Sequence, residues 1–135
     1  MLISWSRYSG TAGMADGPRA LTTYMDAAVV MKRLANDRKH TIRRSPEPEI
    51  LLGDAGLLRM AIRSTTCLHR YSSCVMSFAA GDIAVDAFND GDAEARFGAD
   101  QVLNLWMETA LAGVPSALRP PVYVTTHTHT GALEI

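Results

Sequence analysis

Hydrophobic positions recur along the chain at two spacings, and each spacing predicts one kind of element. Apolar residues follow a helical spacing over residues 19–34 and again over residues 99–112. Asp16-Gly17-Pro18 suits the start of the first stretch, and Gly113 suits the end of the second. We therefore expect two amphipathic helices, with a shorter one over residues 55–63.

Alternating or β-branched stretches predict the strands. A short strand is expected at Leu2, Ile3 and Trp5, a second over residues 71–78 and a last one over residues 122–130. Residues 37–48 are polar and end in two prolines, so they predict an irregular connection. This order of elements indicates an α+β fold in one domain over residues 1–135, with helices packed on a mixed or mainly antiparallel sheet.

Composition narrows the class of protein. With 47% hydrophobic and 20% charged residues, the chain is typical of a soluble globular protein. It has neither an apolar run of about 20 residues nor the apolar segment of a signal peptide, so we expect no membrane segment and a cytoplasmic location. Cys67 and Cys74 lack a CxxC spacing and are expected to be reduced thiols.

Positive charge gathers in the first half of the chain, although the net charge is only −1. Its densest stretch contains Lys32, Arg33, Arg38, Lys39, Arg43 and Arg44. Such a stretch can neutralise nucleic-acid phosphates. A solvated helix end and loop is the other interpretation of the same residues.

A pair of histidines in the last predicted strand is the clearest candidate for chemistry. His127 and His129 alternate with Thr128, so their imidazoles share one face about 6.6 Å apart at Cα. Two imidazoles can bind one divalent ion, and a third ligand would leave a position open for substrate. His40 and His69 are candidates for that third ligand. The alternative is a surface pair on an edge strand.

Four short segments, taken in order, resemble a known family. They are Tyr24-Met25, the Pro-Glu-Pro-Glu-Ile-Leu-Leu-Gly-Asp run at residues 46–54, the His-Arg-Tyr-Ser-Ser run at residues 69–73, and residues 127–135 with the two histidines. In this order the set is similar to the N-terminal nuclease region of relaxase/mobilisation proteins, which nick plasmid DNA for conjugative transfer.

The resemblance implies a metal-dependent endonuclease that cuts a single DNA strand at a transfer origin. Tyr24 corresponds to the nucleophile that attacks the scissile phosphate, and Tyr8 is the second choice. A packed core residue is the alternative for Tyr24. The cofactor would be Mg²⁺, Mn²⁺ or Zn²⁺, held by His127 and His129, and accessory mobilisation proteins would be further partners. Candidate DNA contacts are Arg38, Lys39, Arg43, Arg44 and Arg70.

The family continues beyond its histidine strand, so the resemblance also implies a partial domain whose sheet is incomplete at the C-terminus. Two other functions fit the sequence. One is a non-catalytic DNA- or partner-binding module that uses the basic residues 32–44; an inactive truncated remnant of the nuclease is a further alternative. The other is a histidine-metal hydrolase or oxygenase of small molecules, with Glu134 as a candidate acidic ligand.

Overall fold

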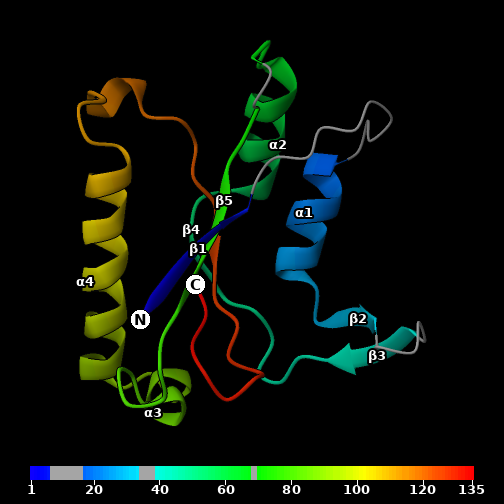
Figure 1. Ribbon diagram of the computed structural model, residues 1–135, viewed down its shortest axis with the longest axis vertical. Helices are drawn as coiled ribbons and strands as arrows, with labels where there is room; N and C mark the ends of the chain where they lie inside the picture. The colour runs from blue at the N-terminus through cyan, green and yellow to red at the C-terminus, as the bar shows by residue number, and fades with distance from the viewer. Residues whose placement is uncertain (7–16, 34–38, 68–69) are drawn as a thin grey trace.

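The computed structural model describes residues 1–6, 17–33, 39–67 and 70–135 (Figure 1). Its main sheet is built from two antiparallel strand pairs. β1 (Leu2–Ser6) pairs with β5 (Ser73–Ser77), and β4 (Ile50–Leu52) pairs with β6 (Val124–Thr125). A separate antiparallel hairpin consists of β2 (Val29–Arg33) and β3 (Lys39–Arg43).

Residues 133–135 join the two pairs into one sheet. The main chains of Met76 and Ile135 exchange two hydrogen bonds of 2.8 and 2.9 Å, and those of His127 and Glu134 exchange two of 2.8 and 2.9 Å. The bridges of Glu134 to both Ser77 and His127 are antiparallel. The order across the sheet is therefore β1, β5, residues 133–135, β6 and β4.

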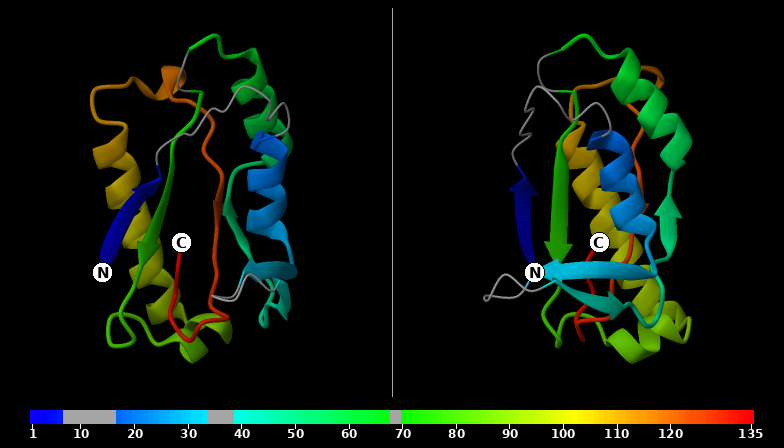
Figure 2. Two further views of the ribbon diagram at one scale, coloured as in Figure 1. Left: turned by 45° about the vertical axis from the view of Figure 1, so that its right-hand side comes forward. Right: turned by 90° about the vertical axis from the view of Figure 1, so that its right-hand side faces the viewer.

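Helices cover both faces of this sheet (Figures 1 and 2). α4 (Ala93–Ala110) packs on one face, where Leu103 lies in a core with Met76, Phe78 and Val124. α1 (Gly17–Asp26) and α2 (Ala55–Ser64) lie on the other. The short α3 (Val85–Asn89) and a 3₁₀ turn (Ser116–Leu118) precede and follow α4. The α+β prediction is confirmed.

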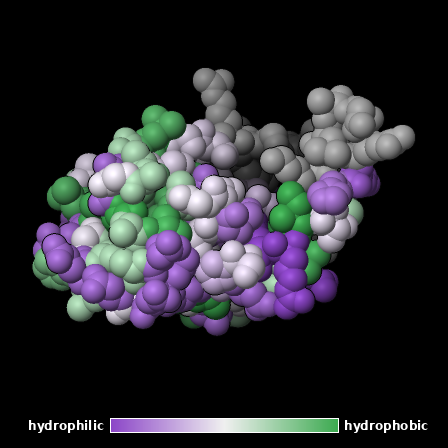
Figure 3. All heavy atoms as spheres, turned by 90° about the horizontal axis from the view of Figure 1, so that it is seen from below, coloured by the Kyte–Doolittle hydropathy of each residue, from purple (hydrophilic) through white to green (hydrophobic). Residues whose placement is uncertain are grey.

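Seen from the α3 end (Figure 3), hydrophilic and hydrophobic side chains are interspersed over the surface. Among the described residues, no helix combines the length and apolarity needed to cross a bilayer.

The first predicted helix is wrong in its extent. α1 ends at Asp26, and β2 follows where residues 29–34 were expected to remain helical. The β-branched pair Val29 and Val30 favours a strand, and the main-chain N–H of Arg44 donates to the carbonyl of Ala28 at 2.7 Å. Residues 37–48 were expected to form an irregular connection, but they contain β3, which pairs with β2.

The later elements also differ at their ends. α4 begins at Ala93, six residues before its expected start at Ala99, because the side chain of Asp92 accepts hydrogen bonds from the N–H groups of Glu94 and Ala95. α3 was not predicted. The last strand is shorter than residues 122–130, since its ladder covers Val124 and Thr125, with a bridge at His127.

Candidate functional site

The two sequence-predicted histidines lie side by side just beyond β6. Their ring centroids are 6.1 Å apart and the rings are inclined at 71°. Both side chains are half-buried. An antiparallel bridge to Glu134 fixes the main chain of His127. This pairing sets the direction in which the His127 side chain leaves the sheet.

Tyr24 comes to the same place from the last turn of α1. Its ring is 6.3 Å from the ring of His127 and almost perpendicular to it, at 87°. The side chain is 55% exposed, so Tyr24 is not the packed core residue of the alternative interpretation. The resemblance paired this tyrosine with the histidines, and the fold brings them together from opposite ends of the chain.

Arg44 lies beneath Tyr24 and is only 1% exposed. Its guanidinium carbon is 4.6 Å from the centroid of the Tyr24 ring, and its Nη1 donates to the carbonyl oxygens of Tyr24 at 2.7 Å and Ala27 at 3.1 Å. A cation at the end of a helix is stabilised by the partial negative charge of the last carbonyls. Arg44 was predicted as a surface DNA contact; the structure buries it because it caps α1.

The carbonyl of Met25 connects α1 to the histidine segment. Nε2 of His127 lies 3.0 Å from this oxygen. Because a carbonyl oxygen can only accept, Nε2 carries the proton and Nδ1 keeps the lone pair. The contact fixes the tautomer of His127.

The surroundings lower the pKa of His127. Burial is the largest cause, and the positive charges of Arg44 and His129 act in the same direction. The hydrogen bond to Met25 and the charge of Glu134 oppose them. Since the ordinary value is 6.5, the imidazole of His127 is neutral at pH 7, which is the form that binds metal.

No group of three or more His, Cys, Asp or Glu side chains forms a metal site among the described residues. His40 is therefore not joined to the pair, and neither is Glu134; His69 lies outside the described residues. A metal held here would need further ligands from water or from a bound phosphate.

The remaining candidate DNA contacts are not gathered at one point. Lys39 and Arg43 are exposed on β3, where Arg43 forms a 3.3 Å ion pair with Glu47. Arg70 is exposed at the entry to β5. Arg38 and the second tyrosine candidate, Tyr8, lie outside the described residues.

Sequence reasoning missed a pair of residues beside the site. The hydroxyl of Tyr123 donates to the carboxylate of Asp26 at the end of α1. Burial and the bond to Asp26 raise the pKa of Tyr123, so this phenol stays protonated and unsuited to nucleophilic attack. The alternation that places Tyr123 on the face of His127 could have indicated its position, but nothing in the sequence pairs it with Asp26.

Comparison of the chain with known protein families, with curated proteins and with solved structures finds no match in any of the three.

Proposed function

We propose that this chain is a relaxase-like, metal-dependent DNA-nicking domain that acts in plasmid mobilisation in the cytoplasm. The observation that carries the proposal is the 6.3 Å approach of Tyr24 to His127, with His129 a further 6.1 Å from His127. A solvent-accessible tyrosine ring beside one of two neighbouring imidazoles suits tyrosine attack on a metal-bound phosphate.

In the proposed reaction the phenolic oxygen of Tyr24 loses its proton to solvent and attacks the phosphorus. The P–O bond to the 3′ oxygen breaks, and that oxygen takes up a proton to become a 3′-OH. The 5′ phosphate stays joined to the tyrosine, so one phosphodiester is exchanged for another and rejoining remains accessible. A divalent ion, when bound, would polarise a non-bridging oxygen of that phosphate.

Arg44 supports this role for Tyr24. Its guanidinium carbon lies 4.6 Å from the centroid of the Tyr24 ring, and its Nη1 donates to the carbonyl oxygen of Tyr24, so Arg44 holds the last turn of α1 and the position of the ring. Its Nε and Nη2 are buried with no hydrogen-bond partner among the described residues, a cost in stability that is often kept at functional sites.

The neutral state of the His127 imidazole favours the proposed binding of a metal ion. Protons and metal ions compete for the same lone pair, so a pKa lowered by burial keeps the ligand available at neutral pH. The proposed metal is Mg²⁺, Mn²⁺ or Zn²⁺. Lys39, Arg43 and Arg70 are exposed and would contact the phosphates of the single strand at the transfer origin, with accessory mobilisation proteins as partners.

A second candidate function is a DNA-binding module without catalysis. It is favoured by the exposed cations Lys39 and Arg43, which lie on an antiparallel hairpin that stands apart from the main sheet. A two-stranded ribbon of this kind can enter a DNA groove. Such binding would weaken with salt and would not respond to removal of metal.

The two functions are distinguished by a covalent adduct. Purified chain is incubated with supercoiled plasmid carrying a transfer origin and Mn²⁺, and the products are denatured before electrophoresis. Nicking predicts open circles with protein attached to the DNA, abolished by Tyr24→Phe and by chelator. Tyr8→Phe and Tyr71→Phe are the matched controls and should retain the adduct.

An adduct that persists in Tyr24→Phe would refute Tyr24 as nucleophile, and its loss in Tyr8→Phe would transfer the role. Salt-sensitive binding with neither nick nor adduct in the wild type would refute the nuclease and leave the binding module.

A further inference from the structure

Arg44 holds the end of α1 through one of its three nitrogens. Nη1 donates to the carbonyl oxygens of Tyr24 and Ala27, whereas Nε and Nη2 are buried and have no hydrogen-bond partner among the described residues. Nε and Nη2 lie on the same edge of the guanidinium, and their N–H bonds along it are parallel. With such an edge arginine binds two oxygens of one phosphate or carboxylate. We call Nε and Nη2 of Arg44 the unpaired edge.

The charge of Arg44 is also unbalanced within the described part of the chain. No carboxylate there forms an ion pair with it, and the acceptors of its hydrogen bonds are neutral carbonyls. His127, whose pKa the charge of Arg44 helps to lower, is neutral at pH 7. A buried cation without a counter-ion is costly in free energy, so an anion at the unpaired edge would stabilise the folded chain.

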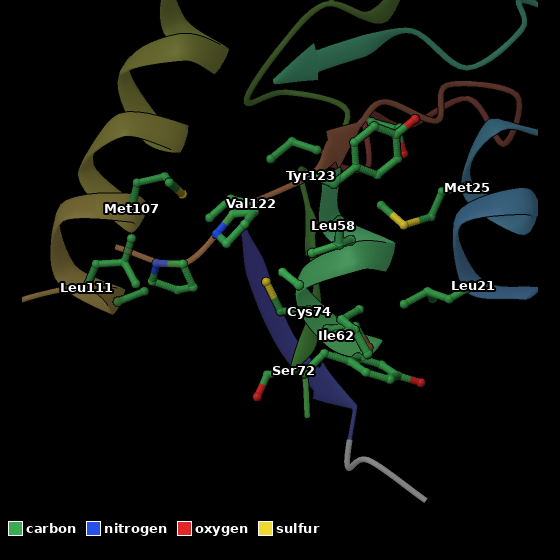
Figure 4. A pocket seen from close by; sticks show the side chains of 18 of the residues that line it. Leu21, Met25, Leu58, Ile62, Ser72, Cys74, Met107, Leu111, Val122 and Tyr123 are labelled. Atoms are coloured by element: carbon green, nitrogen blue, oxygen red, sulfur yellow. The ribbon is translucent and has the colours of Figure 1, made fainter. Parts of the chain in front are cut away.

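The cavity behind α1 supplies no such anion. It has a volume of about 460 Å³, and Leu21 and Met25 of α1 extend into it toward Leu58 of α2 (Figure 4). None of the described residues that line it is an aspartate or a glutamate, and Arg44 is not part of its lining. We therefore expect an anion to reach the unpaired edge from solvent.

Tyr24 is the exposed side chain that packs on this buried guanidinium. Among the described residues, its ring contacts Arg44 and His127, and its hydroxyl takes part in no hydrogen bond. Exposed side chains change rotamer within nanoseconds. Rotation of the Tyr24 ring away from Arg44 would therefore open a path to the guanidinium without a change in the main chain.

We propose that the unpaired edge of Arg44 binds two oxygens of a phosphate group, and that the ring of Tyr24 turns aside to admit it. A phosphate keeps oxygens beyond the two that the edge binds, and these remain available to other groups of the site, whereas a carboxylate keeps none. The choice of phosphate over carboxylate rests on the proposed function. The binding of an oxyanion at this edge does not rest on it.

The Nε–H signal of Arg44 in an NMR spectrum reports directly on the unpaired edge. Isotope-labelled full chain is titrated with inorganic phosphate in the presence of EDTA at constant ionic strength, so neither DNA nor metal takes part. Phosphate should move this proton signal downfield until it saturates, because a charge-assisted hydrogen bond forms. The Nε–H signal of Arg63, which is exposed on the last turn of α2, is the internal control and should show no saturable shift. No saturable shift at Arg44 would overturn the proposal.

Two variants at Tyr24 test the covering ring. Tyr24→Ala removes the ring and should tighten phosphate binding about fivefold, because the covered state no longer competes with the bound one. Tyr24→Phe keeps the ring and should bind phosphate as the wild type does, although it lacks the hydroxyl that the proposed nicking needs. Phosphate binding and nicking can therefore fail separately. Equal affinities in Tyr24→Ala and the wild type would show that the ring does not cover the site.

Two further probes identify the ligand. Acetate should bind at least about tenfold more weakly than phosphate, which carries more charge and more oxygens. Equal affinities for acetate and phosphate would overturn the assignment to phosphate. A dinucleotide with one phosphodiester distinguishes the sources of the group. The same shift at Arg44 with this dinucleotide would support a nucleic-acid phosphate, and a shift with inorganic phosphate alone would support a free phosphate ion.

Discussion

His127 donates a hydrogen bond from Nε2 to the carbonyl oxygen of Met25, at 3.0 Å. Arg44 binds the carbonyls on either side, those of Tyr24 and Ala27. Arg44 and His127 thus both hold the end of α1, and the side chain of Tyr24 contacts both residues. Changes at Arg44 or His127 should therefore alter both the stability of the fold and the position of the Tyr24 phenol.

Arg44→Gln should lower the free energy of unfolding by about 1.5–3 kcal/mol, since hydrogen bonds from a charged donor to the α1 carbonyls are lost. The matched control is Arg43→Gln. Arg43 is exposed and bonds only to Glu47 among the described residues, so its loss should change stability by less than about 0.5 kcal/mol. Urea unfolding followed by circular dichroism measures both. Equal effects would contradict the capping role of Arg44.

Stability should fall as the pH falls below the ordinary histidine pKa of about 6.5. The folded chain lowers the pKa of His127, so between the folded and unfolded values the unfolded chain binds a proton that the folded chain does not. Stability contributed by His127 is therefore complete above about pH 6.5 and is lost as the pH falls through the folded value, by up to about 1.4 kcal/mol per pH unit.

Thermal or urea unfolding between pH 7.5 and pH 5 checks this, with His127→Gln as the comparison. The variant should have a flatter profile than the wild type over this interval. A wild-type profile equally steep in the variant would assign the dependence to other groups.

Mn²⁺ or Zn²⁺ should bind to the histidine pair, and His129→Ala should weaken binding at least about tenfold. His40→Ala is the control, because His40 is exposed on β3 and the described residues contain no metal-ligand group that includes it. Isothermal titration calorimetry at pH 7.5 measures both affinities. Identical isotherms for His129→Ala and the wild type would exclude the half-site.

Gly53→Ala should cost at least about 3 kcal/mol of stability, through strain and close contact together. Gly53 has a φ of 85°, and an added Cβ would lie 2.0 Å from the carbonyl oxygen of Val122. Gly113 has a similar φ of 79° but open space around it, so Gly113→Ala should cost only about 1–2 kcal/mol. Midpoints of urea unfolding compare the two. Similar losses would show that β4 can move away from Val122.

The elements that the sequence predicts well have both a pattern and a local stop signal. α2 was expected over residues 55–63 and extends from Ala55 to Ser64, with Asp54 accepting from the N–H of Leu57 at 2.7 Å. The prediction extended α1 too far because Ala28, Met31 and Leu34 also fit a helical spacing. The signal that ends α1 comes from Arg44, which is distant in sequence, and local spacing does not include it.

Some features of the candidate site could likewise be predicted from local sequence patterns, and others could not. Alternation along a strand predicts two neighbouring imidazoles, and the rings are neighbours, although only His127 forms a bridge and His129 lies in the turn that follows. Only the family resemblance led us to expect Tyr24 near His127, because no local sequence pattern relates the end of α1 to the histidines. Arg43 and Arg44 are identical neighbours in the sequence, and only the packed structure separates an exposed cation from a buried one.

The position of residues 133–135 has a consequence for folding. The hairpin that joins His127 to Glu134 is the only local pairing among the described strands of the main sheet; its other pairings join residues that lie far apart along the chain. Non-local pairings slow folding, because each must first close a long loop. We therefore expect the turn that carries His129 to gain amide protection early and the rest of the sheet to assemble around it slowly. Before assembly is complete, β1 and β5 would expose strand edges that can pair with other chains.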